Sequence, residues 1–131
     1  MSDLILTAEA QQKAGDLIDN SLVKAGVRTV LLIDSAGNVL ANCGQDSQEI
    51  DAISLAALAA ASLGATSQIA KLIGEDDFSL LFHKGKKGNI HFGRIGNDLI
   101  LITIFGDDVS LGLIRVRVSE LEKGIHEIFK G

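Results

Sequence analysis

Hydrophobic positions recur every three to four residues over 8–25, and this spacing predicts an amphipathic helix. Thr7 precedes the pattern and is a typical N-terminal cap, because its hydroxyl can accept a hydrogen bond from a free backbone N–H. Gly26 follows the pattern and is a typical stop, because glycine adopts the left-handed backbone that ends many helices. The predicted structure therefore begins with one helix.

Two strand-like segments follow and predict a tight hairpin. Residues 27–33 are almost entirely apolar, as expected for a central strand that is covered on both faces. Residues 39–43 predict a shorter returning strand. Between them, Asp34 can accept hydrogen bonds from the backbone ahead of it and Gly37 can adopt a positive φ, which suits a turn.

The longest helical pattern covers 49–73 and is rich in small residues, mostly alanine. Gly64 lies inside it, although glycine costs roughly 1 kcal/mol relative to alanine in a helix interior. A helix that packs only on its own sheet usually carries more leucine and isoleucine. We therefore interpret the small-residue face as a surface for a partner helix. Ordinary packing on the sheet is the alternative.

Three further segments predict an antiparallel meander. Residues 78–83 predict a strand that places Phe78, Leu80 and Phe82 on one face. The Lys- and Gly-rich residues 84–88 predict a hairpin turn, after which 89–95 predicts the pairing strand. The continuous apolar run 99–105 predicts a second central strand that is buried on both faces.

The C-terminal segment carries two competing patterns. Residues 114–118 alternate like a strand, but apolar residues keep helical spacing from 111 to 128. The longer pattern favours a helix, with Asp107 or Asp108 as its cap. The order is therefore αββαβββα, which predicts one α/β (α+β) domain over 1–131. A single five-stranded antiparallel sheet would have helices on both faces.

Composition and charge exclude several classes of function. The net charge of −5 disfavours nonspecific binding to nucleic acid or to an anionic membrane. The one cysteine cannot form an intramolecular disulfide, and the N-terminus lacks the pattern of a signal peptide. The apolar tract 52–63 is interrupted by Ser54 and is too short to span a bilayer. We therefore expect a cytoplasmic protein without membrane insertion.

Four segments together resemble the Roadblock/dynein-light-chain family. They are VLLIDSAGNVL at 30–40, the small-residue helix at 52–70, GRIGNDLILITIF at 93–105 and LGLIR at 111–115. The resemblance implies a profilin-like sandwich with strand order 2-1-5-4-3. The second helix would lie on one face of the sheet, and the first and third helices on the other.

The family resemblance also implies partners. Members dimerise through the edge strand and the long helix, and MglB-type members regulate Ras-like small GTPases, one of them as a GTPase-activating protein. The interface residues implied here are Ala57, Ala60, Ala61, Gly64, Gln68, Phe78, Ser79, Leu80, Leu81, Phe82 and His83. If this face meets a partner helix, an arginine at Ala60 or Gly64 should separate the dimer into folded monomers.

Candidate metal and phosphate sites have simpler structural interpretations. A turn centred on Lys86 and Lys87 places His83 opposite residue 90 and His91 opposite residue 82, so that the two imidazoles point to opposite faces. No carboxylate or cysteine joins them at ligand spacing, so we expect no metal site. The turn itself lacks the GxxxxGK[ST] pattern of a phosphate loop, so we expect no cofactor.

Candidate catalytic groups are equally sparse. Cys43 is expected to be a small buried hydrophobe rather than a nucleophile, and Asp34 is explained by its turn. The pair Asp76 and Asp77 is explained by loop solvation. Arg94 is the most plausible arginine finger or GTPase contact, with a solvent-facing strand charge as the alternative. We therefore expect a non-catalytic protein.

Three functions remain open. The first is a homodimeric regulator or scaffold of a Ras-like GTPase, acting indirectly on its switch loops. The second is a small-ligand sensor or enzyme, which predicts an enclosed cavity. The third is an adaptor of a motor or signalling complex without a GTPase. The first is the interpretation that we carry forward.

Overall fold

The computed structural model describes residues 4, 6–78 and 80–130. These residues form a five-stranded sheet in which every neighbouring pair of strands is antiparallel. The predicted order of helices and strands is confirmed. The elements are α1 (Ala8–Ile18), the π-helix η1 (Asp19–Val23), β1 (Thr29–Asp34), β2 (Val39–Cys43), α2 (Ala52–Leu72), β3 (Leu81–Lys84), β4 (Asn89–Ile95), β5 (Leu99–Phe105) and α3 (Leu111–Phe129).

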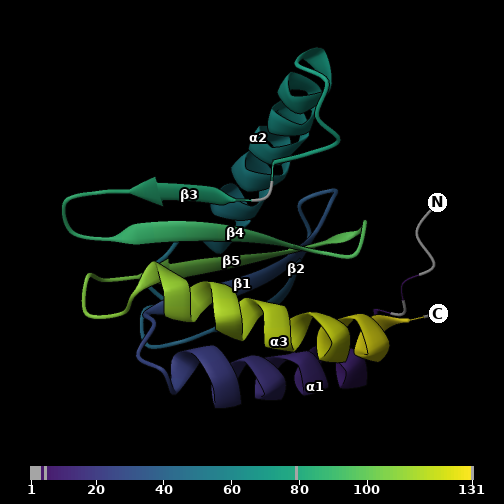
Figure 1. The fold of residues 1–131 in the computed structure, drawn as a ribbon. Helices are drawn as coiled ribbons and strands as arrows, with labels where there is room; N and C mark the ends of the chain where they lie inside the picture. The colour runs from purple at the N-terminus through teal and green to yellow at the C-terminus, as the bar shows by residue number, and fades with distance from the viewer. Residues whose placement is uncertain (1–3, 5, 79, 131) are drawn as a thin grey trace.

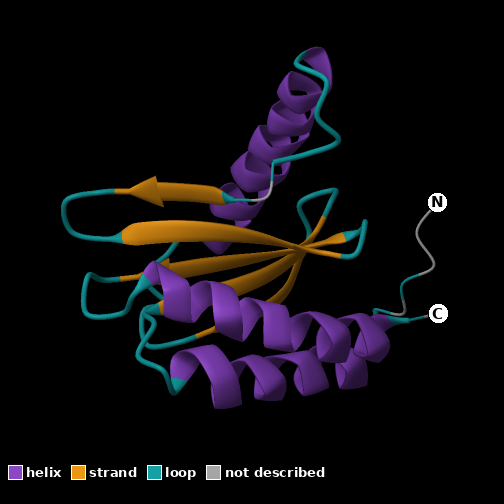
Figure 2. Ribbon diagram, viewed as in Figure 1, coloured by secondary structure: helices purple, strands orange, loops and turns teal. Residues whose placement is uncertain are grey.

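The sheet separates two layers of helices. Its strands lie in the order β2-β1-β5-β4-β3, the order that the family resemblance implies. Figure 1 shows α1 and α3 side by side on one face, while α2 lies on the other face and extends beyond the strands. The same arrangement is visible by element type in Figure 2. The central strands β1 and β5 contribute side chains to a separate core on each face.

The first helix differs from the regular helix that the sequence predicts. Thr7 caps it as expected, since its Oγ1 accepts a hydrogen bond of 3.0 Å from the N–H of Ala10. From Asp19, however, the chain continues as a π-helix. Ile18 and Leu22, on either side of this change, are both fully buried in the core under α1 and α3. The π-helix therefore continues the buried side of α1 with a wider turn.

The β1–β2 turn forms as predicted. Asp34 Oδ1 accepts hydrogen bonds from the N–H groups of Ala36 at 3.0 Å and Asn38 at 2.8 Å. Gly37 adopts a φ of 92°, which a residue with a side chain rarely does. Asp34 is thus explained by the turn, as the sequence suggested.

The third strand begins later than predicted. It covers Leu81–Lys84 instead of 78–83. The preceding segment is tied elsewhere, because Asp77 Oδ1 accepts a hydrogen bond from the N–H of Phe78 and Asp77 Oδ2 pairs with Arg94. At its other end, Lys84 pairs with Asn89, so the turn is shorter than expected.

The caps of the two longer helices also differ from the sequence prediction. The C-terminal helix begins after Ser110, whose side chain accepts from the N–H of Leu113. Asp107 cannot serve as the cap because its Oδ1 accepts from Asn89 and Lys84. The second helix begins at Ala52 rather than at residue 49, since Asp51 caps it.

Candidate interaction surface

The outer face of α2 is largely uncovered. The buried residues of this helix are small apart from one leucine: Ala56, Ala59, Leu63 and Ala70. The first three of them pack against Leu31, Ile33, Ile100 and Ile102 of the central strands. Small side chains let the helix approach the sheet closely. They also bury only a narrow stripe of the helix.

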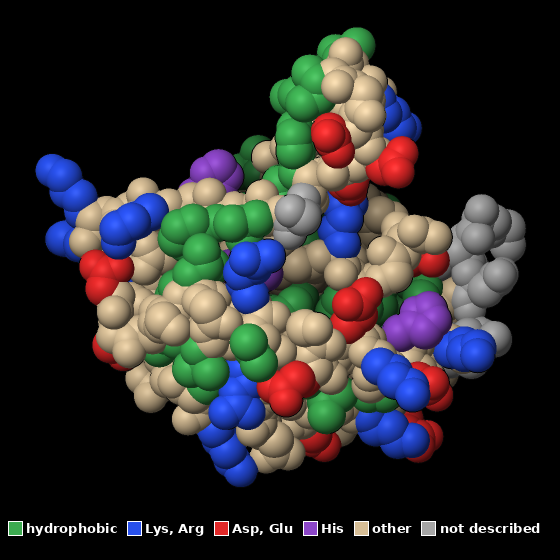
Figure 3. Space-filling view, in the orientation of Figure 1, with side chains coloured by type: hydrophobic (Ala, Val, Ile, Leu, Met, Phe, Trp, Pro, Cys, Tyr) green, Lys and Arg blue, Asp and Glu red, His purple; other side chains and the backbone are tan. Residues whose placement is uncertain are grey.

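Most of the rest of α2 is exposed and largely apolar, with Ser54, Ser62, Gln68 and Lys71 as its exposed polar residues. We call the large exposed side chains of this helix and the residue after it the α2 apolar face; it comprises Ile53, Leu58, Ile69, Leu72 and Ile73, which are 79%, 69%, 54%, 86% and 66% exposed. Figure 3 shows hydrophobic atoms gathered on the projecting end of the helix. A helix that is apolar on every side is normally buried, and large exposed apolar patches mark interaction sites.

The structure places four of the five predicted helical interface residues on the uncovered side. Ala57, Ala61, Gly64 and Gln68 are exposed, and a Cβ added to Gly64 would meet no atom within 4 Å. Ala60 differs, because it is half-buried and packs on the core beneath α2. The proposed test at Ala60 would therefore disturb the sheet packing as well as a partner.

Sequence reasoning missed the α2 apolar face itself. The small-residue stripe drew attention to the positions where a partner helix can approach closely. The large residues lie beside that stripe, and they are the side chains that lose most exposure if a partner covers it. The sequence signal that could have identified these large residues is the absence of any continuous polar stripe around the helix.

The edge strand supplies the second part of the predicted interface. Phe82 faces the core under α3 and stacks on Phe105, with 6.1 Å between the ring centroids. Leu81 faces the core under α2, and His83 is exposed beside the ring of Phe92. The remaining predicted residues lie before β3. Of these, Leu80 is 40% exposed, Phe78 is half-buried, and Ser79 lies outside the described residues.

Arg94 lies between β4 and α2. Its Nη2 donates to the carbonyl of Leu63 at 3.1 Å and to Ser67 Oγ at 2.6 Å, and its Nε lies 2.7 Å from Asp77 Oδ2. The guanidinium is therefore bound within its own chain and is not simply a solvent-facing strand charge. A direct contact with a GTPase would require these bonds to break, and that contact stays a prediction.

The two histidines of the hairpin point to opposite faces, as predicted from the turn. His83 pairs with Ile90 and Phe82 pairs with His91. His91 is buried, and its burial together with the nearby charge of Arg115 lowers its pKa from the ordinary value of 6.5. Among the described residues, no three His, Cys, Asp or Glu side chains gather as a metal site would require.

Cys43 is buried, as its sequence context suggested. Burial, followed by the charges of Asp19 and Asp16, raises the pKa of its thiol to about 11. A thiol with this pKa is almost entirely protonated near neutral pH, and the protonated form is a poor nucleophile. The chemistry of this position therefore suits packing.

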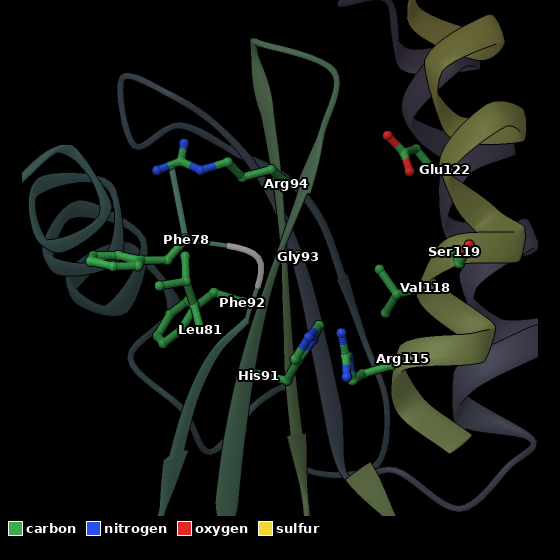
Figure 4. Close-up of a pocket in the computed structure, with 10 residues that line it drawn as sticks. All are labelled: Phe78, Leu81, His91, Phe92, Gly93, Arg94, Arg115, Val118, Ser119 and Glu122. Carbon is green, nitrogen blue, oxygen red and sulfur yellow. The ribbon is translucent and has the colours of Figure 1, made fainter. Parts of the chain in front are cut away.

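A pocket of about 250 Å³ lies around β4. Figure 4 shows that its polar side chains lie on opposite sides of β4: His91 lies on the α3 side and Arg115 extends from α3 toward it, whereas Arg94 extends away on the other side. Arg94 is already bound by Asp77 and Ser67. Ser119 and Glu122 also line the pocket on the side of His91, but among the described residues His91 Nδ1 has no hydrogen-bond partner, so these side chains are not joined as in a catalytic triad.

The basic hairpin ends of β3 and β4 are tied to the rest of the sheet. Lys84 Nζ lies 2.9 Å from Asp107 Oδ1, and Gly85 donates its N–H to the carbonyl of Gly88. The next element is β4, so no helix N-terminus follows the turn to bind a phosphate. The turn closes a hairpin, in agreement with the simpler sequence interpretation.

By length and composition alone, α2 is apolar enough to cross a membrane. The helix covers 21 residues, so it is longer than the apolar tract 52–63 and, unlike that tract, long enough to span a bilayer. The same composition is expected of a helix that is covered by protein on every side. The helix packs on the sheet along one side, so we interpret its other side as a protein-binding surface.

Comparisons with known proteins identify the family. The chain matches the Roadblock/LC7 domain over residues 13–105. The structure of Myxococcus xanthus MglB is 34% identical and has a TM-score of 0.83, with 98% of each chain covered. The gliding protein MglB from Thermus thermophilus is 26% identical with a TM-score of 0.85, covering 98% of this chain and 96% of that one.

Two further similarities are informative. A structure described as MglB with a tetrameric arrangement is 26% identical, with a TM-score of 0.86 over 98% of this chain and 96% of that one. Profilin II from Acanthamoeba castellanii is 15% identical with a TM-score of 0.60 over 83% of this chain and 92% of that one, which shows a shared fold only. No protein of curated function matches the chain. The domain match and the similarity over the whole chain lead to one conclusion: the chain belongs to the Roadblock/LC7 family.

Proposed function

We propose that this chain is a homodimeric regulator or scaffold of a Ras-like small GTPase in the cytoplasm. The observation that carries the proposal is the α2 apolar face, because large apolar side chains exposed together on one helix mark a surface that a partner covers. Family membership and the similarity to MglB proteins support the GTPase as partner. The tetrameric arrangement named for one relative supports self-association.

The dimer is expected to pair two α2 helices and two β3 edges. The small exposed residues Ala57, Ala61 and Gly64 allow the backbones of two helices to approach, while the α2 apolar face supplies the buried area. β3 is the last strand of the sheet, so its outer backbone is positioned to extend the sheet into a second copy. Both contacts together would leave a continuous sheet under paired helices.

Regulation of the GTPase would be indirect. The pocket around β4 gathers no catalytic set, and the guanidinium of Arg94 is bound within its own chain. A dimer that binds the switch loops can accelerate hydrolysis by favouring their competent arrangement, without supplying a chemical group. Binding without acceleration would make the same dimer a scaffold.

The dimer surface is tested with two matched glycines. Gly64 of α2 and Gly112 of α3 are both helical and exposed, and both have open space where a Cβ would lie. Gly64→Arg is expected to give a folded monomer in analytical ultracentrifugation, with a helical circular dichroism spectrum like that of the wild type. Gly112→Arg is expected to remain a dimer. A Gly64→Arg variant that still dimerises would contradict the proposed surface.

The partner is tested with a Ras-like GTPase from the same organism, chosen first from any that is encoded beside this chain. The wild-type dimer is expected to bind the GTPase and raise its GTP turnover, and the Gly64→Arg monomer is expected to do so less. Binding with unchanged turnover would identify a scaffold. The absence of binding would remove the GTPase from the proposal and favour an adaptor of another complex.

A further inference from the structure

The projecting half of α2 has little support from the sheet. Beyond Leu63, Ala70 is the one buried residue of the helix. Figure 1 shows this half extending past the edge of the strands. The segment that returns from the helix contacts its end, since Glu75 donates its N–H to the carbonyl of Ala70 at 2.9 Å. Beyond the continuity of the helix itself, hydrophobic packing on the sheet therefore contributes little to the position of this half.

Arg94 is placed to restrain the projecting half of α2. From β4 its Nη2 reaches the carbonyl of Leu63 and the hydroxyl of Ser67, at the point where α2 leaves the sheet. Its Nε pairs with Asp77, which also lies near the hydroxyl of Ser67. One side chain thus joins the strand, the helix and the returning segment.

The ion pair between Arg94 and Asp77 is partly shielded from water. The side chains of Arg94 and Asp77 are 33% and 32% exposed, so water screens their attraction less than it does for a fully exposed pair. Hydrogen bonds from a guanidinium are stronger than those between neutral groups. The hydroxyl of Ser67, 2.6 Å from Nη2, adds a second anchor on the helix.

We propose that Arg94 is a positioning residue, which together with Asp77 sets the direction in which the projecting half of α2 leaves the sheet. Arg94 then acts through the helix instead of touching a partner. Because that half carries part of the α2 apolar face, its direction also sets how two copies meet. This second consequence rests on the proposed homodimer, whereas the first does not.

Four variants test the role of the pair. Arg94→Gln and Asp77→Asn each remove one charge with little change of volume, and the double variant completes a thermodynamic cycle. Arg94→Lys keeps the charge but lacks the fork that reaches the helix and Asp77 together. The matched control is Lys84→Gln, which breaks the ion pair with Asp107 at the other end of the same edge strand.

The first measurement is amide hydrogen exchange in the full chain. Residues 64–72 are expected to exchange about tenfold faster in Arg94→Gln and in Asp77→Asn than in the wild type. Arg94→Lys should restore part of the protection, and the double variant should be no faster than Arg94→Gln. Amide exchange of α3 should stay at the wild-type rate in all these variants. Exchange of residues 64–72 should stay at the wild-type rate in Lys84→Gln. Unchanged exchange over 64–72 in Arg94→Gln would overturn the proposal.

The second measurement follows the geometry of the dimer. A spin label is attached at Lys71→Cys in a Cys43→Ala background. Pulsed electron paramagnetic resonance then reports the distance between the ends of the two α2 helices. Arg94→Gln is expected to broaden or shift this distance distribution, and Lys13→Gln, which breaks an exposed ion pair with Glu9 on α1 away from the proposed interface, to leave it unchanged. An unchanged distribution would overturn the consequence for the dimer. If the wild type gave no distance between subunits, the homodimer itself would fail, and the exchange result would still decide the role of Arg94.

Discussion

The two faces of the sheet are packed in different ways. Under α1 and α3, large side chains such as Ile18, Ile114 and Phe129 are fully buried and interlock with the strands. Under α2, the helix contributes mainly alanines, and its large apolar side chains point away from the sheet. The layer of α1 and α3 therefore completes a core with the sheet. The helix α2 buries only the side that faces the sheet and leaves its outer side exposed.

This difference separates residues that hold the fold from residues that are available to a partner. The central strands β1 and β5 are buried on both sides, so α2 covers the part of the sheet that it crosses. The exposed apolar area lies on the helix and not on the strands. Loss of a large side chain should therefore have different consequences on the two faces. Under α1 and α3 it should lower the free energy of unfolding, and on the outer side of α2 it should weaken self-association.

The largest expected effect is on the packed face. Ile114 is fully buried, so Ile114→Ala should lower the free energy of unfolding by about 2 to 5 kcal/mol. Leu58 is 69% exposed, so Leu58→Ala should change monomer unfolding by less than about 0.5 kcal/mol while weakening self-association. Urea denaturation of each variant in the Gly64→Arg background measures unfolding without the dimer.

The comparison would be wrong if Leu58→Ala destabilised the monomer as much as Ile114→Ala does. Such a result would mean that the outer side of α2 is covered within a single chain. Sedimentation of Leu58→Ala without the Gly64→Arg change gives the second readout, and an unchanged dimer would remove Leu58 from the interface.

A pair of glycines gives a smaller and more specific contrast. Gly93 lies on β4 under α3, and a Cβ at this position would be 2.8 Å from Cγ1 of Val118. Gly93→Ala should therefore cost about 1 to 3 kcal/mol through overpacking. Val118→Ala should relieve most of that cost in the double variant, because it removes the clashing methyl group. Denaturation of the two single variants and the double variant measures the coupling.

Gly64→Ala is the counterpart on the open face. The helix gains about 0.5 to 1 kcal/mol from the better propensity of alanine, since a Cβ would meet nothing within 4 Å. The dimer should weaken, because an added methyl group separates two helices in close contact. The two effects have opposite signs and are measured by urea denaturation in dilute solution and by the concentration dependence of sedimentation. A dimer as strong as the wild type would mean that Gly64 lies outside the contact.

The fold was predictable where a local pattern decided it. The apolar runs of β1 and β5 and the turn built on Asp34 and Gly37 needed no information from elsewhere in the chain. The errors fall where distant residues compete for the same group. Asp77 binds Arg94 and so delays β3, and Asp107 binds Lys84 and Asn89 and so leaves the cap of α3 to Ser110.

The candidate surface was predictable in part for the same reason. The small residues of α2 indicated a close approach, and the structure leaves most of them exposed. The large exposed residues depend on which side of the helix meets the sheet, and an almost uniformly apolar sequence does not specify that side. The role of Arg94 depends on three elements that meet only in the folded chain.

The smallest expected effect concerns pH and again belongs to the packed face. Burial, reinforced by Arg115, lowers the pKa of His91 below the ordinary value of 6.5. Below that pH the unfolded chain binds a proton at His91 that the folded chain excludes, so this residue reduces stability as the pH falls through 6.5 toward the folded pKa. Above 6.5 the imidazole is neutral in both states and its effect disappears.

His91→Gln should remove this part of the pH dependence of urea unfolding. Arg115→Gln should raise the pKa of His91 in an NMR titration. His83→Gln, at an exposed position of the neighbouring strand, is the control and should keep the wild-type slope. A wild-type slope in His91→Gln would place the proton-linked step elsewhere in the molecule.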